Sequence, residues 1–125
     1  MSISKEAGLM PHNEGDHLDA DIVAELEEIM EDDFGVLLET YLDDATQKIT
    51  GLQAALNAND AGELRELAHS FKGASCNIGA LPLSRLCETV EDLAKQGELA
   101  EVGPLLPGIE NEYAAVKSLL SSKLA

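Results

Sequence analysis

Apolar residues recur at three- and four-residue steps through most of this chain, and that spacing limits what it can fold into. The clearest case runs from about Asp33 to Asn57, where the apolar side chains fall on one face of a single long helix. The same spacing predicts helices over about 60–78, 82–96 and 109–124, and a shorter one over 18–30. No strand-like alternation and no internal repeat competes with this pattern. We therefore predict an all-α protein, an antiparallel four-helix bundle with a short additional N-terminal helix.

Residues that start and stop helices divide these segments. Asp60, with Glu63 three residues later, predicts a capped helix start. The sequence "GALP" predicts a break, because Gly79 can adopt a left-handed conformation and Pro82 fits the first turn of a helix. A similar stop is expected at Gly97. The stretch "ELAEVGPLLPG" leaves two alternatives open, a loop or a broken first turn before the last helix.

The composition limits which side chains can form the core and which partners the chain can bind. Only 3% of the residues are aromatic, so the core has to be built from aliphatic side chains. The formal net charge of −16 repels phosphate backbones and anionic lipid headgroups, and we expect neither nucleic acid nor a membrane as a partner. No stretch reaches the roughly 20 apolar residues of a membrane span, and the N-terminus has no apolar signal-peptide core. We expect a cytoplasmic monomer.

A length of 125 residues suits one domain. Residues 1–17 mix glycine, proline, histidine and charge without periodicity, so we predict a flexible N-terminal arm there and a single bundle domain over 18–125. His12 and His17 have no third ligand nearby, and their spacing does not predict a metal site. Cys76 and Cys87 fall within predicted helices, and we expect reduced, partly buried thiols there.

One histidine falls on the outer face of its helix. At about 100° per residue, His69 lies opposite the apolar sector of its segment, and Lys72 and Gly73 also lie away from that sector. Each of these residues alone is typical of a solvated helix face. Glycine inside a helix costs about 1 kcal/mol relative to alanine, however, so Gly73 suggests a place where another molecule approaches. The predicted core face consists of Leu64, Leu67, Ala68, Phe71, Ala74, Ser75 and Ile78.

The stretch "AHSFKGASCNIGA" resembles the signature of histidine-containing phosphotransfer (HPt) domains, an AH-x-x-KG-[SA] core followed by a small-residue turn. The resemblance extends to the flanking helices and covers about residues 20–123. It implies that His69 accepts a phosphoryl group, that Lys72 stabilises that group, and that Gly73 permits close approach of the partner.

The resemblance also implies a polar residue near the histidine on the next helix, at Glu91, although Glu88 or Glu66 could serve instead. The imidazole chemistry follows from general principles. A neutral imidazole is nucleophilic near pH 7, and a hydrogen bond to Nδ1 would leave Nε2 as the attacking nitrogen. We therefore expect Nε2 of His69 to attack the phosphoryl group of a receiver aspartate.

The resemblance implies a phosphoryl carrier in a two-component phosphorelay rather than an autonomous enzyme, with receiver domains of hybrid sensor kinases and of response regulators as its partners. The sequence contains no GxxxxGK[ST] phosphate loop and no Asp cluster like that of a receiver. We expect no cofactor on this chain and Mg²⁺ on the receiver. Docking is expected on an apolar patch around His69, formed by the helices at 33–57 and 60–78. A further hypothesis is that the negative charge of the chain selects among receivers by repelling some of them.

Three alternatives remain at this point. The chain could be a non-catalytic helical adaptor that binds a receiver or another signalling protein without being phosphorylated. It could also be the phosphoacceptor domain of a larger chemotaxis-type kinase. A dimetal bundle is disfavoured, because such a site requires two Glu-x-x-His pairs and the sequence offers one, Glu66 with His69.

Overall fold

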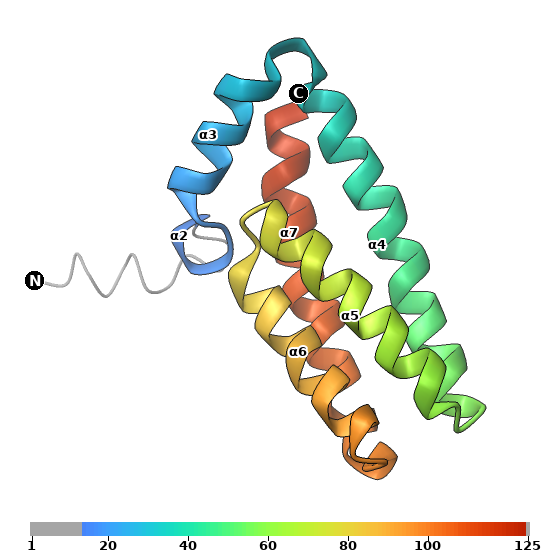
Figure 1. Cartoon of the computed structure of the whole chain (residues 1–125). Coiled ribbons are helices and arrows are strands. Elements are labelled where there is room, and N and C mark those ends of the chain that lie inside the picture. The colour runs from blue at the N-terminus through green and yellow to red at the C-terminus, as the bar shows by residue number, and fades with distance from the viewer. Residues whose placement is uncertain (1–13, 125) are drawn as a thin grey trace, which may run out of the picture.

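Four long helices form an antiparallel bundle in the computed structural model, which describes residues 14–124 (Figure 1). No strand occurs in that part of the chain. The prediction of an all-α bundle with a short additional N-terminal helix is confirmed. The elements in chain order are α2 (Glu14–His17), α3 (Ala20–Met30), the 3₁₀ turn η1 (Glu31–Asp33), α4 (Phe34–Asn57), α5 (Ala61–Asn77), α6 (Leu81–Lys95), the 3₁₀ turns η2 (Leu99–Glu101) and η3 (Gly103–Leu105), and α7 (Leu106–Leu124).

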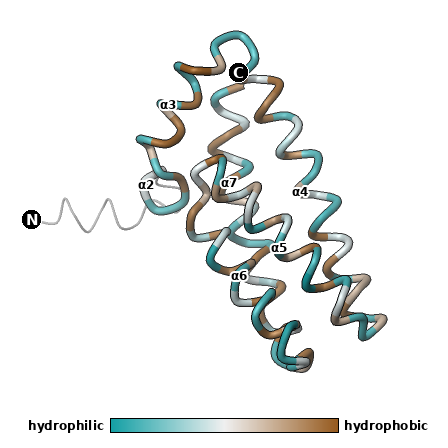
Figure 2. The backbone as a smooth tube through the Cα atoms, viewed as in Figure 1, coloured by the Kyte–Doolittle hydropathy of each residue, from teal (hydrophilic) through white to brown (hydrophobic). Residues whose placement is uncertain are grey.

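The apolar faces of these helices meet in one core. Hydrophobic and hydrophilic segments alternate along each helix, as expected when one face of each is turned inward (Figure 2). On α5 most of the predicted core face is confirmed, because Leu64, Ala68, Phe71 and Ser75 are fully buried and Ile78 after them is buried too. Leu67 and Ala74 are only partly buried and pack against the edge of the core. Ser75 is polar, and its hydroxyl forms a hydrogen bond of 2.8 Å with the buried Tyr41 hydroxyl. The hydrogen bond removes the cost of burying two polar groups in an aliphatic core.

The N-terminal boundary of the folded region lies earlier than the sequence suggested. Residues 14–17, the last part of the predicted arm, form the helical turn α2, while residues 1–13 lie outside the described residues. Two contacts explain this turn: Leu18 is buried, and His17 Nδ1 lies 2.7 Å from a carboxylate oxygen of Glu112 on α7. The backbone N–H of Asp19 then donates to the carbonyl of Gly79 at 2.8 Å, which ties the start of α3 to the α5–α6 turn.

The predicted helix boundaries agree closely with the structure. The Asp60 carboxylate accepts from the backbone N–H of Glu63 at 3.0 Å, as the capping pattern predicted. Gly79 and Gly97 both have positive φ, 88° and 75°, and end α5 and α6. For "ELAEVGPLLPG" the sequence left a loop and a broken first turn as alternatives. The structure has two short 3₁₀ turns there, followed by α7 with Pro107 in its first turn.

The two cysteines occupy different environments, and both are free thiols. Cys87 is buried in the core, and burial raises the pKa of its thiol to about 12. Cys76 is exposed rather than partly buried, because it lies on the outer face of α5. Within residues 14–124, no helix combines the length and the hydropathy that crossing a membrane requires.

The Gly79 turn generates a prediction about stability. A Cβ at Gly79 would have a left-handed backbone and would lie 3.3 Å from both the Asp19 carbonyl oxygen and the Ile22 side chain, whereas a Cβ at Gly97 would meet nothing within 4 Å. Because the two glycines share the conformational cost, Gly97→Ala should lower the free energy of unfolding by about 1 kcal/mol, and Gly79→Ala by about 2 kcal/mol or more. Urea unfolding measures both values, and equal losses would contradict the proposed contact between the turn and α3.

Candidate functional site

The site lies on the outer side of the α5–α6 pair. The short turn at Gly79 makes these helices antiparallel neighbours, so that residues near the middle of α5 lie beside residues near the end of α6 (Figure 1). The Ser84 hydroxyl, near the start of α6, donates to the carbonyl oxygen of Lys72 at 3.0 Å and fixes the alignment of the pair. This alignment brings Glu91 next to His69, 22 positions earlier in the chain.

His69 points outward, as the sequence predicted, and 67% of its side chain is exposed. Its Nδ1 lies 2.8 Å from Oε2 of Glu91. An ionised carboxylate can only accept a hydrogen bond, so Nδ1 carries the hydrogen and Nε2 of the neutral ring keeps its lone pair. The unprotonated nitrogen is therefore the one available to a partner.

Glu91 is a charged residue in a buried position, with 4% of its surface exposed. Lys72 Nζ lies 2.7 Å from Oε1, and Lys95 Nζ lies 3.8 Å from Oε2, the oxygen that accepts from His69. The contact with Lys72 is the main reason that the pKa of Glu91 is lowered, and the hydrogen bond with His69 acts in the same direction, whereas burial opposes both. The pair also raises the pKa of Lys72. Glu91 is thus held as a carboxylate, which is the form that fixes the imidazole.

Gly73 leaves an opening one turn beyond His69 on α5. A Cβ built at this position would have no atom within 4 Å, so the glycine is not required for packing between helices. The absence of a side chain leaves the backbone of α5 accessible next to the imidazole. This is consistent with the close approach that the sequence suggested for Gly73.

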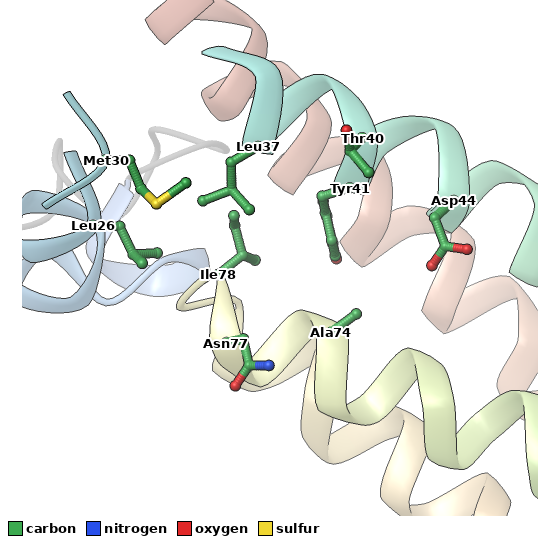
Figure 3. Close-up of a pocket in the computed structure, with 9 residues that line it drawn as sticks. All are labelled: Leu26, Met30, Leu37, Thr40, Tyr41, Asp44, Ala74, Asn77 and Ile78. Carbon is green, nitrogen blue, oxygen red and sulfur yellow. The ribbon is translucent and has the colours of Figure 1, made fainter. Parts of the chain in front are cut away.

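An apolar cavity of about 410 Å³ lies further along the same helix, between α3, α4 and α5 (Figure 3). Asn77, on its edge, follows His69 and Gly73 in four-residue steps, so the three residues form one row along α5. The sequence predicted an apolar patch around His69 formed by α4 and α5. This cavity differs from that patch, because α3 also lines it and His69 does not. The cavity is lined by Leu26, Met30, Leu37, Thr40, Tyr41, Asp44, Ala74, Asn77 and Ile78.

The apolar side chains of α3 are divided between the bundle core and this cavity. Val23 is fully buried in the core. Leu26 and Met30 are only partly buried, because they line the open cavity instead of entering the bundle core.

The structure brings together three of the four predicted site residues: His69, Lys72 and Glu91 make direct contacts. Of the three acids considered, Glu91 contacts the imidazole, while Glu88 and Glu66 are exposed. Lys95 was not predicted as part of the site. Its position four residues after Glu91 on the same helix was the available signal, since residues at that spacing are neighbours. Among residues 14–124 no group of three or more His, Cys, Asp or Glu side chains could hold a metal ion.

The chain is thus a four-helix bundle with an exposed imidazole that is hydrogen-bonded to a buried carboxylate. In a comparison with known families, the model of the Hpt domain family matches residues 36–119. The chain belongs to the Hpt domain family, and the resemblance seen in its sequence is confirmed.

Individual relatives agree with this assignment. The structure of histidine-containing phosphotransfer protein B (HptB) from Pseudomonas aeruginosa PAO1 superimposes with a TM-score of 0.85 and 42% sequence identity, over 86% of this chain and 94% of that one. The HPT domain of a sensor hybrid histidine kinase from Shewanella has the same fold, with a TM-score of 0.69 and 24% identity over 86% and 92% of the two chains. Multistep phosphorelay regulator 1 from Schizosaccharomyces pombe is 31% identical over 78 residues, which span 62% of this chain and about a quarter (26%) of that relative.

The ion pair at Glu91 predicts a specific pH dependence. A carboxylate with a lowered pKa stabilises the folded state above the ordinary pKa of about 4.3, and this stabilisation is lost as the pH falls through the lower folded-state value. Glu91→Gln should therefore cost about 1–2 kcal/mol of unfolding free energy at pH 7 and less at pH 3, as measured by urea unfolding at both values. Glu88→Gln, an exposed acid on the same helix, is the control. A cost for Glu91→Gln that does not change with pH would contradict the assignment.

Proposed function

We propose that this chain is a histidine phosphotransfer protein that carries a phosphoryl group between receiver-domain aspartates through Nε2 of His69. Its membership of the Hpt domain family and its likeness to a histidine-containing phosphotransfer protein support a phosphotransfer role in phosphorelay signalling. The observation that carries the finer proposal is the hydrogen bond from Nδ1 of an exposed His69 to the buried Glu91 carboxylate. We also propose that the chain works as a cytoplasmic monomer.

The transfer is a substitution at phosphorus. The lone pair of Nε2 forms an N–P bond while the P–O bond of the receiver's aspartyl phosphate breaks, and the aspartate leaves as a carboxylate. Glu91 remains hydrogen-bonded to Nδ1–H throughout and stabilises the positive charge that develops on the ring. The reverse reaction, with a second receiver, delivers the phosphoryl group and restores the neutral imidazole.

Lys72 supplies positive charge to the reacting group. Its side chain is 28% exposed, and its ammonium lies 2.7 Å from a carboxylate oxygen of Glu91, which keeps the ammonium near the imidazole without complete burial. An ammonium has three donors and binds phosphoryl oxygens well. Phosphoryl transfer also needs in-line positioning and a metal ion, and we propose that the receiver brings both, with Mg²⁺ bound on the receiver.

The surface that receives the partner would run along α5 from His69 across Gly73 to the cavity at Asn77. Gly73 offers a place where the partner's backbone can come close, and the cavity offers apolar surface to side chains of a partner helix. We propose that a receiver occupies both at once, since the attacking nitrogen needs a partner held in a fixed orientation.

The phosphotransfer proposal is tested by mixing the purified protein with labelled phospho-receivers and Mg²⁺. The wild type and His12→Gln should gain label that is labile in acid and stable in base, and His69→Gln should gain none. Chelating Mg²⁺ before mixing should stop the transfer without removing label that is already on His69. If no receiver in a broad panel transfers label but receivers still bind, the chain is an adaptor and the proposal is wrong.

The docking proposal is tested by filling the opening at Gly73. Gly73→Leu should lower the rate of transfer from a receiver by at least about tenfold, which corresponds to about 1.4 kcal/mol, because the added side chain keeps the partner away. Gly108→Leu is a matched control, because a Cβ at Gly108 on α7 also has nothing within 4 Å. Both variants should fold as stably as the wild type, since leucine is a better helix former than glycine. Equal transfer rates for the two variants would show that the partner does not approach over Gly73.

A further inference from the structure

Lys95 contacts the same carboxylate as Lys72 but is held less firmly. Lys72 Nζ lies 2.7 Å from Oε1 of Glu91, whereas Lys95 Nζ lies 3.8 Å from Oε2. The Lys95 side chain is 52% exposed, against 28% for Lys72. A weakly held, exposed ion pair contributes little to stability, so Lys95 can leave Glu91 at small cost. Lys72 cannot do so as easily, because its departure would leave most of the charge on a buried carboxylate uncompensated.

The charges of the site change when His69 carries a phosphoryl group. The group adds about two negative charges near neutral pH, next to the single negative charge of Glu91. Lys72 offsets one of these charges, and the positive charge on the phosphorylated ring offsets another. The rest of the chain is strongly acidic, with 24 acids against eight bases, so its general field does not favour a further anion at this surface. A second cation within reach of the imidazole would offset the negative charge that remains.

We propose that Lys95 is this second cation: on phosphorylation of His69 it moves from Oε2 of Glu91 to the phosphoryl group on Nε2, while Lys72 stays on Oε1. The proposal rests on the proposed function, and it adds a positioning residue on α6 that the signature around the histidine does not contain. The flexible stem of lysine permits the movement. Lys95 thus pairs with Glu91 in the unphosphorylated protein and with the phosphoryl group in the phosphorylated protein.

The test uses a phosphoryl donor that needs no receiver. Phosphoramidate transfers its phosphoryl group when Nε2 forms the N–P bond and ammonia leaves. The pH at which the ³¹P resonance of phosphorylated His69 titrates is then measured in the full-length protein. A nearby cation favours the dianion of the phosphoryl group, so Lys95→Gln should raise this titration midpoint by about 0.5 pH unit. Lys95→Arg keeps the positive charge, so its midpoint should lie close to that of the wild type. High salt should reduce the difference, because the group is exposed.

Lys117→Gln is the control. Lys117 is exposed on α7, on the side that faces α4, and it is not among the residues in contact with Glu91. Its variant should titrate within about 0.1 unit of the wild type, since only screened interactions remain. An unchanged midpoint for Lys95→Gln, an equal shift for Lys117→Gln, or failure of phosphoramidate to phosphorylate His69 would overturn the proposal. If phosphoramidate phosphorylates His69 and receivers do not, the proposed function fails, while the role of Lys95 is still decided by the titration.

Discussion

The site depends on the contacts that the buried carboxylate of Glu91 makes with His69 and Lys72. A charge with 4% of its surface exposed is stable only when it is paired, and here its partners are the side chains on which the proposed phosphotransfer depends. Its hydrogen bond with His69 fixes which ring nitrogen carries the hydrogen, and its contact with Lys72 keeps a cation beside the ring. One acid therefore sets both the tautomer of the His69 imidazole and the local charge.

The fold serves this interaction by holding two helices in one alignment. The left-handed conformation of Gly79 reverses the chain between α5 and α6, and the contact of that turn with Asp19 links it to the start of α3. The hydrogen bond from Ser84 to the Lys72 carbonyl oxygen keeps the two helices from sliding. Because α5 and α6 pack along their length and Glu91 accepts a hydrogen bond from the ring, His69 can be largely exposed and still have a defined orientation.

The sequence predicted most of the fold, because periodicity, capping residues and glycine stops are local signals. The outward direction of His69 followed from the helical period, and the start of α5 from Asp60. The sequence alone could not decide between Glu91, Glu88 and Glu66, because that choice depends on the alignment of α5 with α6 and not on either helix alone. The cavity beside α3 was missed for the same reason, since it arises where separate helices meet. Lys95 lies on the same helix as Glu91 and joins the site only once Glu91 is known to lie beside His69.

The central claim is that Glu91 holds the hydrogen on Nδ1 and leaves Nε2 to accept the phosphoryl group. Long-range ¹H–¹⁵N NMR of the histidine rings, recorded before and after phosphorylation, tests it most directly. The account predicts that neutral His69 is protonated at Nδ1, that the phosphoryl group is on Nε2, and that Glu91→Leu gives a mixture of tautomers. Protonation at Nε2 in the resting protein, or a phosphoryl group on Nδ1, would contradict it.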